Sequence, residues 1–125
     1  MQKQFSWPEG HWNWPIDINN KHGVRCGNMI WVGGQVDLNA AGEVQNSDAL
    51  EIQIANVVRN FDRVLQEFHC ALQDLVFLNC FYVNDGSLDE GDFLDLLATE
   101  LPEQVRTAIT VIPVPALCYD GLMLE

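Results

Sequence analysis

The sequence predicts an α+β fold: a mixed sheet with two helices packed on one face. Three features lead to this prediction, namely one long segment of helical periodicity, a second helix signal further along, and apolar β-rich runs around both. Their order, β-β-α-β-α-β-β, is typical of sheets whose helices lie on one side. The 125 residues suit one domain, because single cores fill at roughly 100–150 residues.

The first 20 residues form an irregular arm that is rich in indoles. Trp7, Trp12 and Trp14 lie among prolines and a glycine, and three indoles so close together are costly to leave exposed. We therefore expect the arm to lie across its own domain or a neighbour, either simply packed or as a wall of a ligand pocket. The chain divides into this arm, residues 1–20, and a single domain over residues 21–125.

The first strand of the domain is predicted over Met29–Val36, which is apolar and rich in β-forming residues. Within it, Gly33-Gly34 indicates a bulge or a close approach of the backbone to another group. The turn at Asn39–Gly42 then leads into a short strand at Glu43-Val44.

The clearest prediction is a helix of about 20 residues. Asp48, with Glu51 three residues later, resembles a capping box in which Asp replaces the usual Ser or Thr. Behind this start, apolar residues recur at i, i+3, i+4 and i+7 and so form one buried stripe. They are Leu50, Ile54, Val57, Val58, Phe61, Val64, Leu65 and Phe68.

A buried strand is predicted over Leu75–Val83, an apolar run that Asn79 interrupts and that is far too short to span a membrane. Ser87 with Glu90 then forms a capping box that opens a second helix, and Pro102 closes that region. The apolar side of the second helix includes Phe93, Leu94, Leu96 and Leu97.

Two further strands complete the predicted sheet. Val105–Val114 is rich in β-branched residues and bounded by prolines, and a turn at Tyr119–Gly121 leads to a last strand at Leu122–Glu125.

The cysteines and histidines do not form a metal-binding pattern. Each of the four cysteines lies in an apolar context, so we expect reduced, buried thiols in a cytoplasmic protein. The spacing His22-x-x-x-Cys26 offers two ligands, fewer than a zinc site uses. No nucleotide or phosphate-loop fingerprint occurs. This leaves reactions that a carboxylate, a guanidinium and backbone groups perform without a metal or an organic cofactor.

The charge distribution singles out one arginine. The chain carries 18 acids and 6 bases, a net charge of −12, which argues against a nucleic-acid partner. Arg106 is the one base after residue 63. It either pairs with Glu103 or a helix carboxylate, or its planar fork holds a substrate carboxylate in a bidentate manner.

Several short motifs, in their order along the chain, are shared with a known family. They are Gly23-Val24-x-x-Gly27-Asn28-Met29-Ile30, Gly34-Gln35-Val36, Gly42-Glu43-Val44, Gln53 with Asn60, Arg106, and the closing Leu122-Met123-Leu124-Glu125. Over roughly residues 20–125 the chain resembles the reactive intermediate deaminases, the RidA or YjgF family. The Trp-rich arm and the segment Pro113–Gly121 are similar to the branch near 2-aminomuconate deaminase.

The resemblance implies a chorismate-mutase-like fold and a homotrimer. The sheets of three subunits would form a central barrel, with the helices outside and three clefts between subunits. It also implies hydrolysis of small imino or enamino acids with release of ammonia and without a cofactor. No nucleic acid or membrane is implied as a partner.

The resemblance also implies the site residues. Arg106 falls on the carboxylate-binding arginine and Glu125 on the glutamate that positions water, although an ungapped alignment would bring Asp120 near that place instead. Backbone groups near Thr107 and Gly33 would fix the substrate nitrogen. Gly33, Thr107 and Asn20 stand where many members have Ser, Cys and Tyr, so Asn20 is expected at the substrate with an altered role.

Two alternatives to the deaminase reading remain at this stage. One is a non-catalytic trimeric module that binds small carboxylates or a partner protein. The other is a hydrolase of amide or carbamoyl nitrogen in a catabolic pathway. An endoribonuclease role, sometimes ascribed to the family, fits poorly with the charge of −12. The family's last strand normally continues past its glutamate, so the end at Glu125 is consistent with a truncated chain.

Overall fold

The computed structural model describes residues 1–14 and 18–125, so Pro15 of the arm lies outside the described residues. Strands β1 (Lys3–Ser6), β2 (Gly23–Cys26) and β3 (Met29–Val32) form an antiparallel sheet in that order. Strands β4 (Phe77–Val83) and β5 (Ala108–Val114) form a parallel pair. Parallel and antiparallel pairing thus both occur, as the predicted mixed α+β architecture requires.

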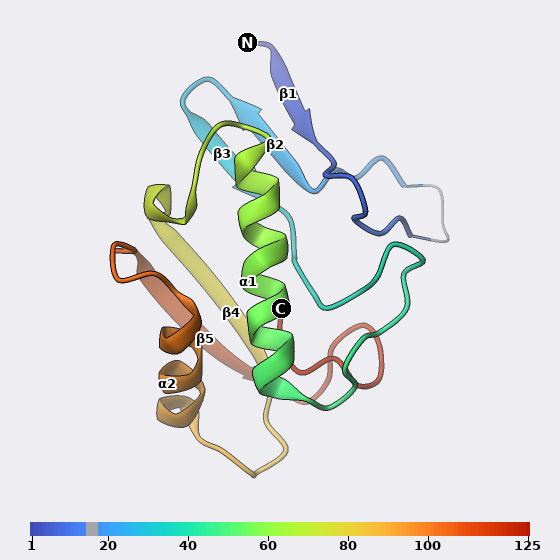
Figure 1. Ribbon diagram of the computed structural model, residues 1–125, viewed down its shortest axis with the longest axis vertical. Helices are drawn as coiled ribbons and strands as arrows, with labels where there is room; N and C mark the ends of the chain where they lie inside the picture. Colours follow the sequence, from blue (N-terminus) through green and yellow to red (C-terminus); the bar gives the residue numbers. More distant parts are fainter. Residues whose placement is uncertain (15–17) are drawn as a thin grey trace.

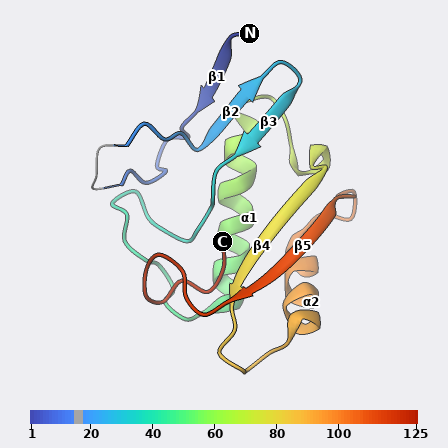
Figure 2. The ribbon, with the colours of Figure 1, turned by 180° about the vertical axis from the view of Figure 1, so that it is seen from behind.

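Two α-helices lie on one side of these strands. They are α1 (Leu50–Gln66) and α2 (Glu90–Glu100), and a short 3-10 helix, η1 (Leu72–Asp74), follows α1. In Figure 1 both α-helices lie in front of the strands, and in Figure 2, seen from behind, the strands lie in front of both helices. The predicted packing of two helices on one face is therefore confirmed. None of the described helices is long and apolar enough to cross a membrane.

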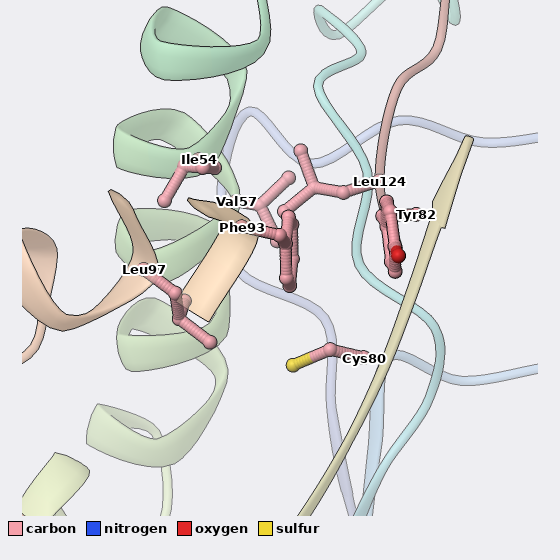
Figure 3. Packing of buried hydrophobic residues seen from close by; sticks show 7 residues of the cluster. All are labelled: Ile54, Val57, Cys80, Tyr82, Phe93, Leu97 and Leu124. Carbon is pink, nitrogen blue, oxygen red and sulfur yellow. The ribbon is translucent and has the colours of Figure 1, made fainter. Parts of the chain in front are cut away.

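The core between the helices and β4 is built by the predicted apolar stripe. Figure 3 shows this cluster, in which Ile54 and Val57 of α1, Phe93 and Leu97 of α2, and Cys80 and Tyr82 of β4 pack together with Leu124. Tyr82 and Phe93 stack with ring centroids 4.7 Å apart and planes 12° from parallel. Stacked aromatic pairs of this kind add to the free energy gained from burial.

The arm contributes a second apolar cluster. Trp12 is 1% exposed and packs with Val36, Leu38 and Leu122. The described part of the arm is therefore packed on its own domain, as expected. It also contains β1, in a segment that the sequence predicts to be irregular: Lys3–Ser6 has little β signal of its own and becomes a strand because β2 pairs with it.

The strand predicted over 29–36 ends earlier than expected, at Val32. The reason is the side chain of Gln35, whose amide bonds the Gly33 and Gly34 carbonyls at 3.2 Å each. Those carbonyls are therefore not offered to a neighbouring strand. The short strand predicted at Glu43-Val44 is reduced to an isolated bridge between Leu38 and Val44.

Both predicted helix caps are wrong by one or two residues. Ala49, which has no capping side chain, precedes α1. Asp48 has a φ of 60°, and its backbone N–H donates to the Gly121 carbonyl at 3.0 Å.

The capping box that opens α2 joins Asp89 and Asp92. The hydroxyl and the backbone N–H of Ser87 instead donate to Asp85, and Ser87 lies two residues before the residue that caps the helix.

The two closing strands differ in their pairing. Strand β5 begins at Ala108, two residues after Arg106, and Pro113 lies within it. The last segment runs antiparallel to β4 through a bridge between Tyr82 and Leu124. Its position is fixed by two backbone hydrogen bonds between Phe81 and Glu125, of 2.9 and 2.8 Å.

All four cysteines are free thiols, but the expectation that they are buried holds for only one. Cys80 is buried in the core, where burial raises its pKa to about 11, whereas Cys26 and Cys70 are half-buried and Cys118 is exposed. Apolar neighbours in sequence therefore did not determine burial, because each position depends on which face of its element meets the core.

Candidate functional site

The carboxylate of Glu125 lies in a half-buried position against the backbone of Gly34. A Cβ added at Gly34 would overlap Oε1 of Glu125, so only glycine allows this approach. Burial raises the pKa of Glu125 above its ordinary value of 4.5. The close backbone approach predicted for Gly33-Gly34 is therefore observed, and the group that it meets is the carboxylate expected to position water.

The Gly33-Gly34 backbone is held by a buried amide. Nε2 of Gln35 donates to the carbonyls of both glycines, and Gly33 itself donates to the carbonyl of His22 at 2.8 Å. The glycine backbone has more conformational freedom than that of any other residue. Hydrogen bonds such as these are therefore needed to keep the Gly33-Gly34 pair in one geometry. The sequence shows Gln35 only as part of a shared motif and does not predict that its amide holds the Gly33 and Gly34 carbonyls. We call this arrangement the Gln35 clamp.

Two buried histidines hold the amide of Gln35 in turn. Nε2 of His11 contacts Oε1 of Gln35 at 3.0 Å, and Nδ1 of His22 contacts Nε2 of Gln35 at 3.3 Å. Burial lowers the pKa of both histidines, that of His11 to about 4. Both rings are therefore neutral near pH 7. Because these histidines lack the spacing of metal ligands, the sequence predicts no role for them, and only the fold brings them together at Gln35.

A cysteine that the sequence reading did not single out lies beside the carboxylate. Although the residue is largely exposed, partial burial of the Cys118 thiol and the charge of Glu125 both raise its pKa. Cys118 belongs to the segment between β5 and the last strand. On either side of it, Leu117 and Tyr119 pack against the second apolar cluster, where Tyr119 stacks on Trp14 with centroids 5.9 Å apart. That segment therefore connects the arm to the neighbourhood of Glu125.

Arg106 is exposed and lies just before β5. Its guanidinium donates to the backbone carbonyls of Glu103 and Val105, rather than to the Glu103 carboxylate that was considered as a partner. The neighbouring Thr107 is half-buried, and its hydroxyl donates to the carbonyl of Ala108 at 3.1 Å. The cation is thus held at the surface by weak neutral partners, which an anionic ligand can replace.

Arg106 and Glu125 are not brought together within one chain. Glu125 pairs with Phe81, which lies opposite Ile112 in β5, whereas Arg106 precedes Ala108. Ile112 lies four positions after Ala108 along the strand, a distance of roughly 13 Å at about 3.3 Å per residue. The two predicted site residues therefore lie near opposite ends of β5.

The two remaining site candidates, Asp120 and Asn20, lie in a turn and in the arm. Asp120 is exposed in the turn before Gly121, whereas Glu125 is half-buried against a backbone. With its oxygen toward the indole, the amide of Asn20 accepts from Nε1 of Trp14 at 3.0 Å and donates to the carbonyl of Ile18 at 3.2 Å. The side chain of Asn20 thus makes hydrogen bonds within the arm.

A groove of about 730 Å³ lies between the start of α1 and α2, away from these residues. Its lining includes the carboxylates of Glu51, Asp92 and Asp95. Such a surface repels a carboxylate substrate, and none of the predicted site residues lines it.

The chain is similar in sequence and fold to proteins of one family. The family model described as Endoribonuclease L-PSP matches residues 18–123. No curated protein matches the chain in sequence. Among solved structures, the yeast protein YEO7 superposes with a TM-score of 0.80 at 17% identity, covering 98% of this chain and 93% of that one.

Two further structures share the fold. One is a protein of unknown function of the conserved Rid protein family from Yersinia pestis, with a TM-score of 0.79 and 19% identity over 98% and 94% of the two chains. The other, from Mycobacterium tuberculosis, is a member of the YjgF/YER057c/UK114 family, with a TM-score of 0.64 and 17% identity over 86% and 81%.

Proposed function

Because the chain belongs to the Endoribonuclease L-PSP family, whose members include the Rid and YjgF proteins, we propose that it hydrolyses a small imino or enamino acid. The products are a keto acid and ammonia, as in the branch near 2-aminomuconate deaminase. The observation that carries the proposal is the half-buried carboxylate of Glu125 against Gly34. Its raised pKa suits a group that takes and returns a proton nearer neutrality.

The reaction uses a carboxylate and a guanidinium. Arg106 binds the substrate carboxylate and so orients the carbon of the C=N bond. Glu125 takes a proton from a water molecule as the water oxygen bonds to that carbon, the C=N electron pair moves to nitrogen, and nitrogen takes a proton from solvent to give a carbinolamine. The protonated Glu125 then gives its proton to the amine, the C–N bond breaks as the hydroxyl loses its proton to solvent and becomes the keto group, and ammonia leaves. An enamine first gains a proton on carbon to become the imine.

The separation of Arg106 from Glu125 favours a site between subunits. Within one chain Arg106 precedes the start of β5, whereas Glu125 pairs with Phe81, which lies opposite Ile112. We assign Arg106 of one subunit and Glu125 of a neighbouring subunit to each site of a homotrimer. Thr107 accompanies Arg106 in this arrangement, and Gly33 accompanies Glu125.

The outer face of the sheet supports such an assembly. Phe5 and Trp31 flank Val24 in one row across β1, β2 and β3, and their side chains are 58% and 52% exposed. Phe77 of β4 is 54% exposed. Figure 2 shows this side of the sheet without a described helix over it. Exposed aromatic residues gathered on one face are typical of an association surface.

The direct test is ammonia release from an imino acid generated in solution. We expect activity in the wild type and a loss of at least about tenfold in Arg106→Ala, because the substrate loses its charged partner. Arg59→Ala removes the same charge from an exposed site on α1 and should keep full activity. Wild-type activity in Arg106→Ala would refute the role of Arg106.

The alternatives give different results in the same assays. Carboxylate binding that depends on Arg106, with ammonia release no faster than without protein, would indicate a binding module. Activity on stable amides but not on imines would indicate an amide or carbamoyl hydrolase. Cleavage of RNA, the activity in the family's description, is disfavoured by the net charge of −12.

Mixing two inactive variants tests the shared site. If each site takes Arg106 and Glu125 from different subunits, trimers assembled randomly from Arg106→Ala and Glu125→Gln chains recover about a quarter of the wild-type activity, because one pairing in four is intact. Recovery below a few per cent after verified subunit exchange would place both groups in one subunit.

A further inference from the structure

The buried side chain of Gln35 joins the N-terminal arm to the backbone that faces Glu125. Gln35 is 3% exposed, His11 6% and His22 3%. His11 belongs to the arm, while His22 directly precedes β2. One amide thus contacts both histidines and the carbonyls of Gly33 and Gly34.

The proton positions in this cluster follow from one carbonyl. The carbonyl of Trp12 can only accept, so Nε2 of His22, which lies 3.0 Å from it, carries a proton. In the neutral ring, Nδ1 of His22 is then an acceptor, and the amide nitrogen of Gln35 must face it. Oε1 of Gln35 consequently faces His11, whose Nε2 carries the proton of that bond.

The two glycine carbonyls demand the same amide orientation. Both can only accept, and both lie 3.2 Å from Nε2 of Gln35. The nitrogen has two N–H groups for three surrounding acceptors, so one N–H is shared between two of them, but all three acceptors require the nitrogen and not the oxygen on this side. Turning the amide over would set its oxygen against three acceptors, so these contacts favour one orientation, although Nδ1 of His11 and Nε1 of Trp12 have no hydrogen-bond partner in the described part of the chain.

We propose that Gln35 is a positioning residue, which His11 and His22 hold so that its amide fixes the Gly33-Gly34 backbone against the Glu125 carboxylate. The inference rests on the proposed function for its effect on catalysis, although the contacts stand without it. The Trp-rich arm then serves the site indirectly: it supplies His11 and the Trp12 carbonyl and need not touch the substrate.

The test is the titration of Glu125 in folded Gln35→Met protein, measured from its carboxyl NMR signal. The Glu125→Gln variant, which lacks this signal, identifies it. Met has the length of Gln and no amide, so the glycine backbone loses its clamp. Water then reaches the carboxylate, and we expect the pKa of Glu125 to move back toward 4.5.

Kinetics give a second measurement. We expect kcat to fall about tenfold or more, because a small displacement of a catalytic group is costly, while KM changes little because Arg106 binds the substrate carboxylate. Val57→Ala, a core variant on α1, provides a control of reduced stability and should leave the titration of Glu125 unchanged. A purely structural role for Gln35 would make the two variants behave alike.

The outcomes separate the inference from the proposed function. A shifted titration in Gln35→Met supports the positioning role even if no ammonia is released by any form. An unchanged titration in the folded variant overturns the role, whether or not the protein is a deaminase. Should Gln35→Met fail to fold, the same titration is made on His11→Leu, which removes the partner of the Gln35 oxygen. A pKa of Glu125 that moves toward its ordinary value supports the positioning role, and an unchanged pKa overturns it.

Discussion

Gly34 and Glu125 meet so closely that a side chain on the first would displace the carboxylate of the second. The contact joins the segment after β3 to the segment that runs antiparallel to β4. It half-buries a carboxylate with an elevated pKa beside a backbone that Gln35 clamps. The hydrogen bonds of Gln35 fix this backbone, so the surface against which the carboxylate lies needs little rearrangement during the reaction.

Replacing Gly34 by Ala should impair activity far more than stability. The atom in the way is the end of a flexible side chain, so we expect a loss of less than about 1 kcal/mol in the free energy of unfolding. The turned carboxylate should lower ammonia release at least about tenfold. Urea unfolding and the ammonia assay measure the two effects, with Gly91→Ala on α2 as the control. Full activity in Gly34→Ala would contradict the assignment of Glu125.

Replacing Glu125 by Gln should abolish activity and stabilise the fold at neutral pH. Because burial raises the pKa of Glu125, the folded protein binds a proton there more readily than the unfolded chain does. The contribution to stability is therefore present at low pH and is lost as the pH rises from 4.5 through the folded pKa. Gln carries no such charge, so Glu125→Gln should melt above the wild type at pH 7.

The pH dependence of the rate distinguishes the two candidate acids. The rate should rise with pH through the raised pKa of Glu125, since the ionised form accepts the proton of water. Asp120→Asn should keep this rise. If Asp120→Asn lost it while Glu125→Gln kept it, the roles of the two acids would be exchanged.

Acid should destabilise the protein through its buried histidines. The folded pKa of His11 is about 4, against an ordinary value of 6.5, because burial and the charges of His22 and Arg63 disfavour its protonation while Gln35 partly offsets them. The unfolded chain thus binds more protons in this window, and stability falls as the pH falls from 6.5 to 4.

The expected slope is up to about 1.4 kcal/mol per pH unit for each such histidine. Urea unfolding between pH 7 and 4.5 measures it. His11→Leu should flatten the profile, whereas His69→Asn, at an exposed position with positive φ, should leave it unaltered. An equally steep profile in His11→Leu would show that other groups control acid stability.

The helix cap of α2 can be tested by two neighbouring substitutions. Asp89→Ala should cost about 1 kcal/mol, because it leaves the backbone N–H of Asp92 without its partner. Ser87→Ala should cost less than about 0.5 kcal/mol, since its bonds to Asp85 are exposed. Chemical denaturation compares the two; a larger effect at Ser87 would restore the cap first expected from the sequence.

The sequence alone determined the features that depend on near neighbours. The stripe from Leu50 to Phe68 predicts α1 because helical periodicity is a local property, and Gly33-Gly34 marks a close approach because only glycine permits one. The fold class follows from the order of such elements. The charge of Arg106 was equally visible, because a lone cation stands out in an acidic segment.

Only the tertiary structure decided which distant groups meet. Strand β1 exists because β2 pairs with it, and Gln35 becomes a clamp because the arm brings His11 to it. The strand register separates Arg106 from Glu125 within one chain, and no local pattern reports that distance. Contacts between remote segments depend on pairing and packing partners, which periodicity and spacing along the chain do not encode.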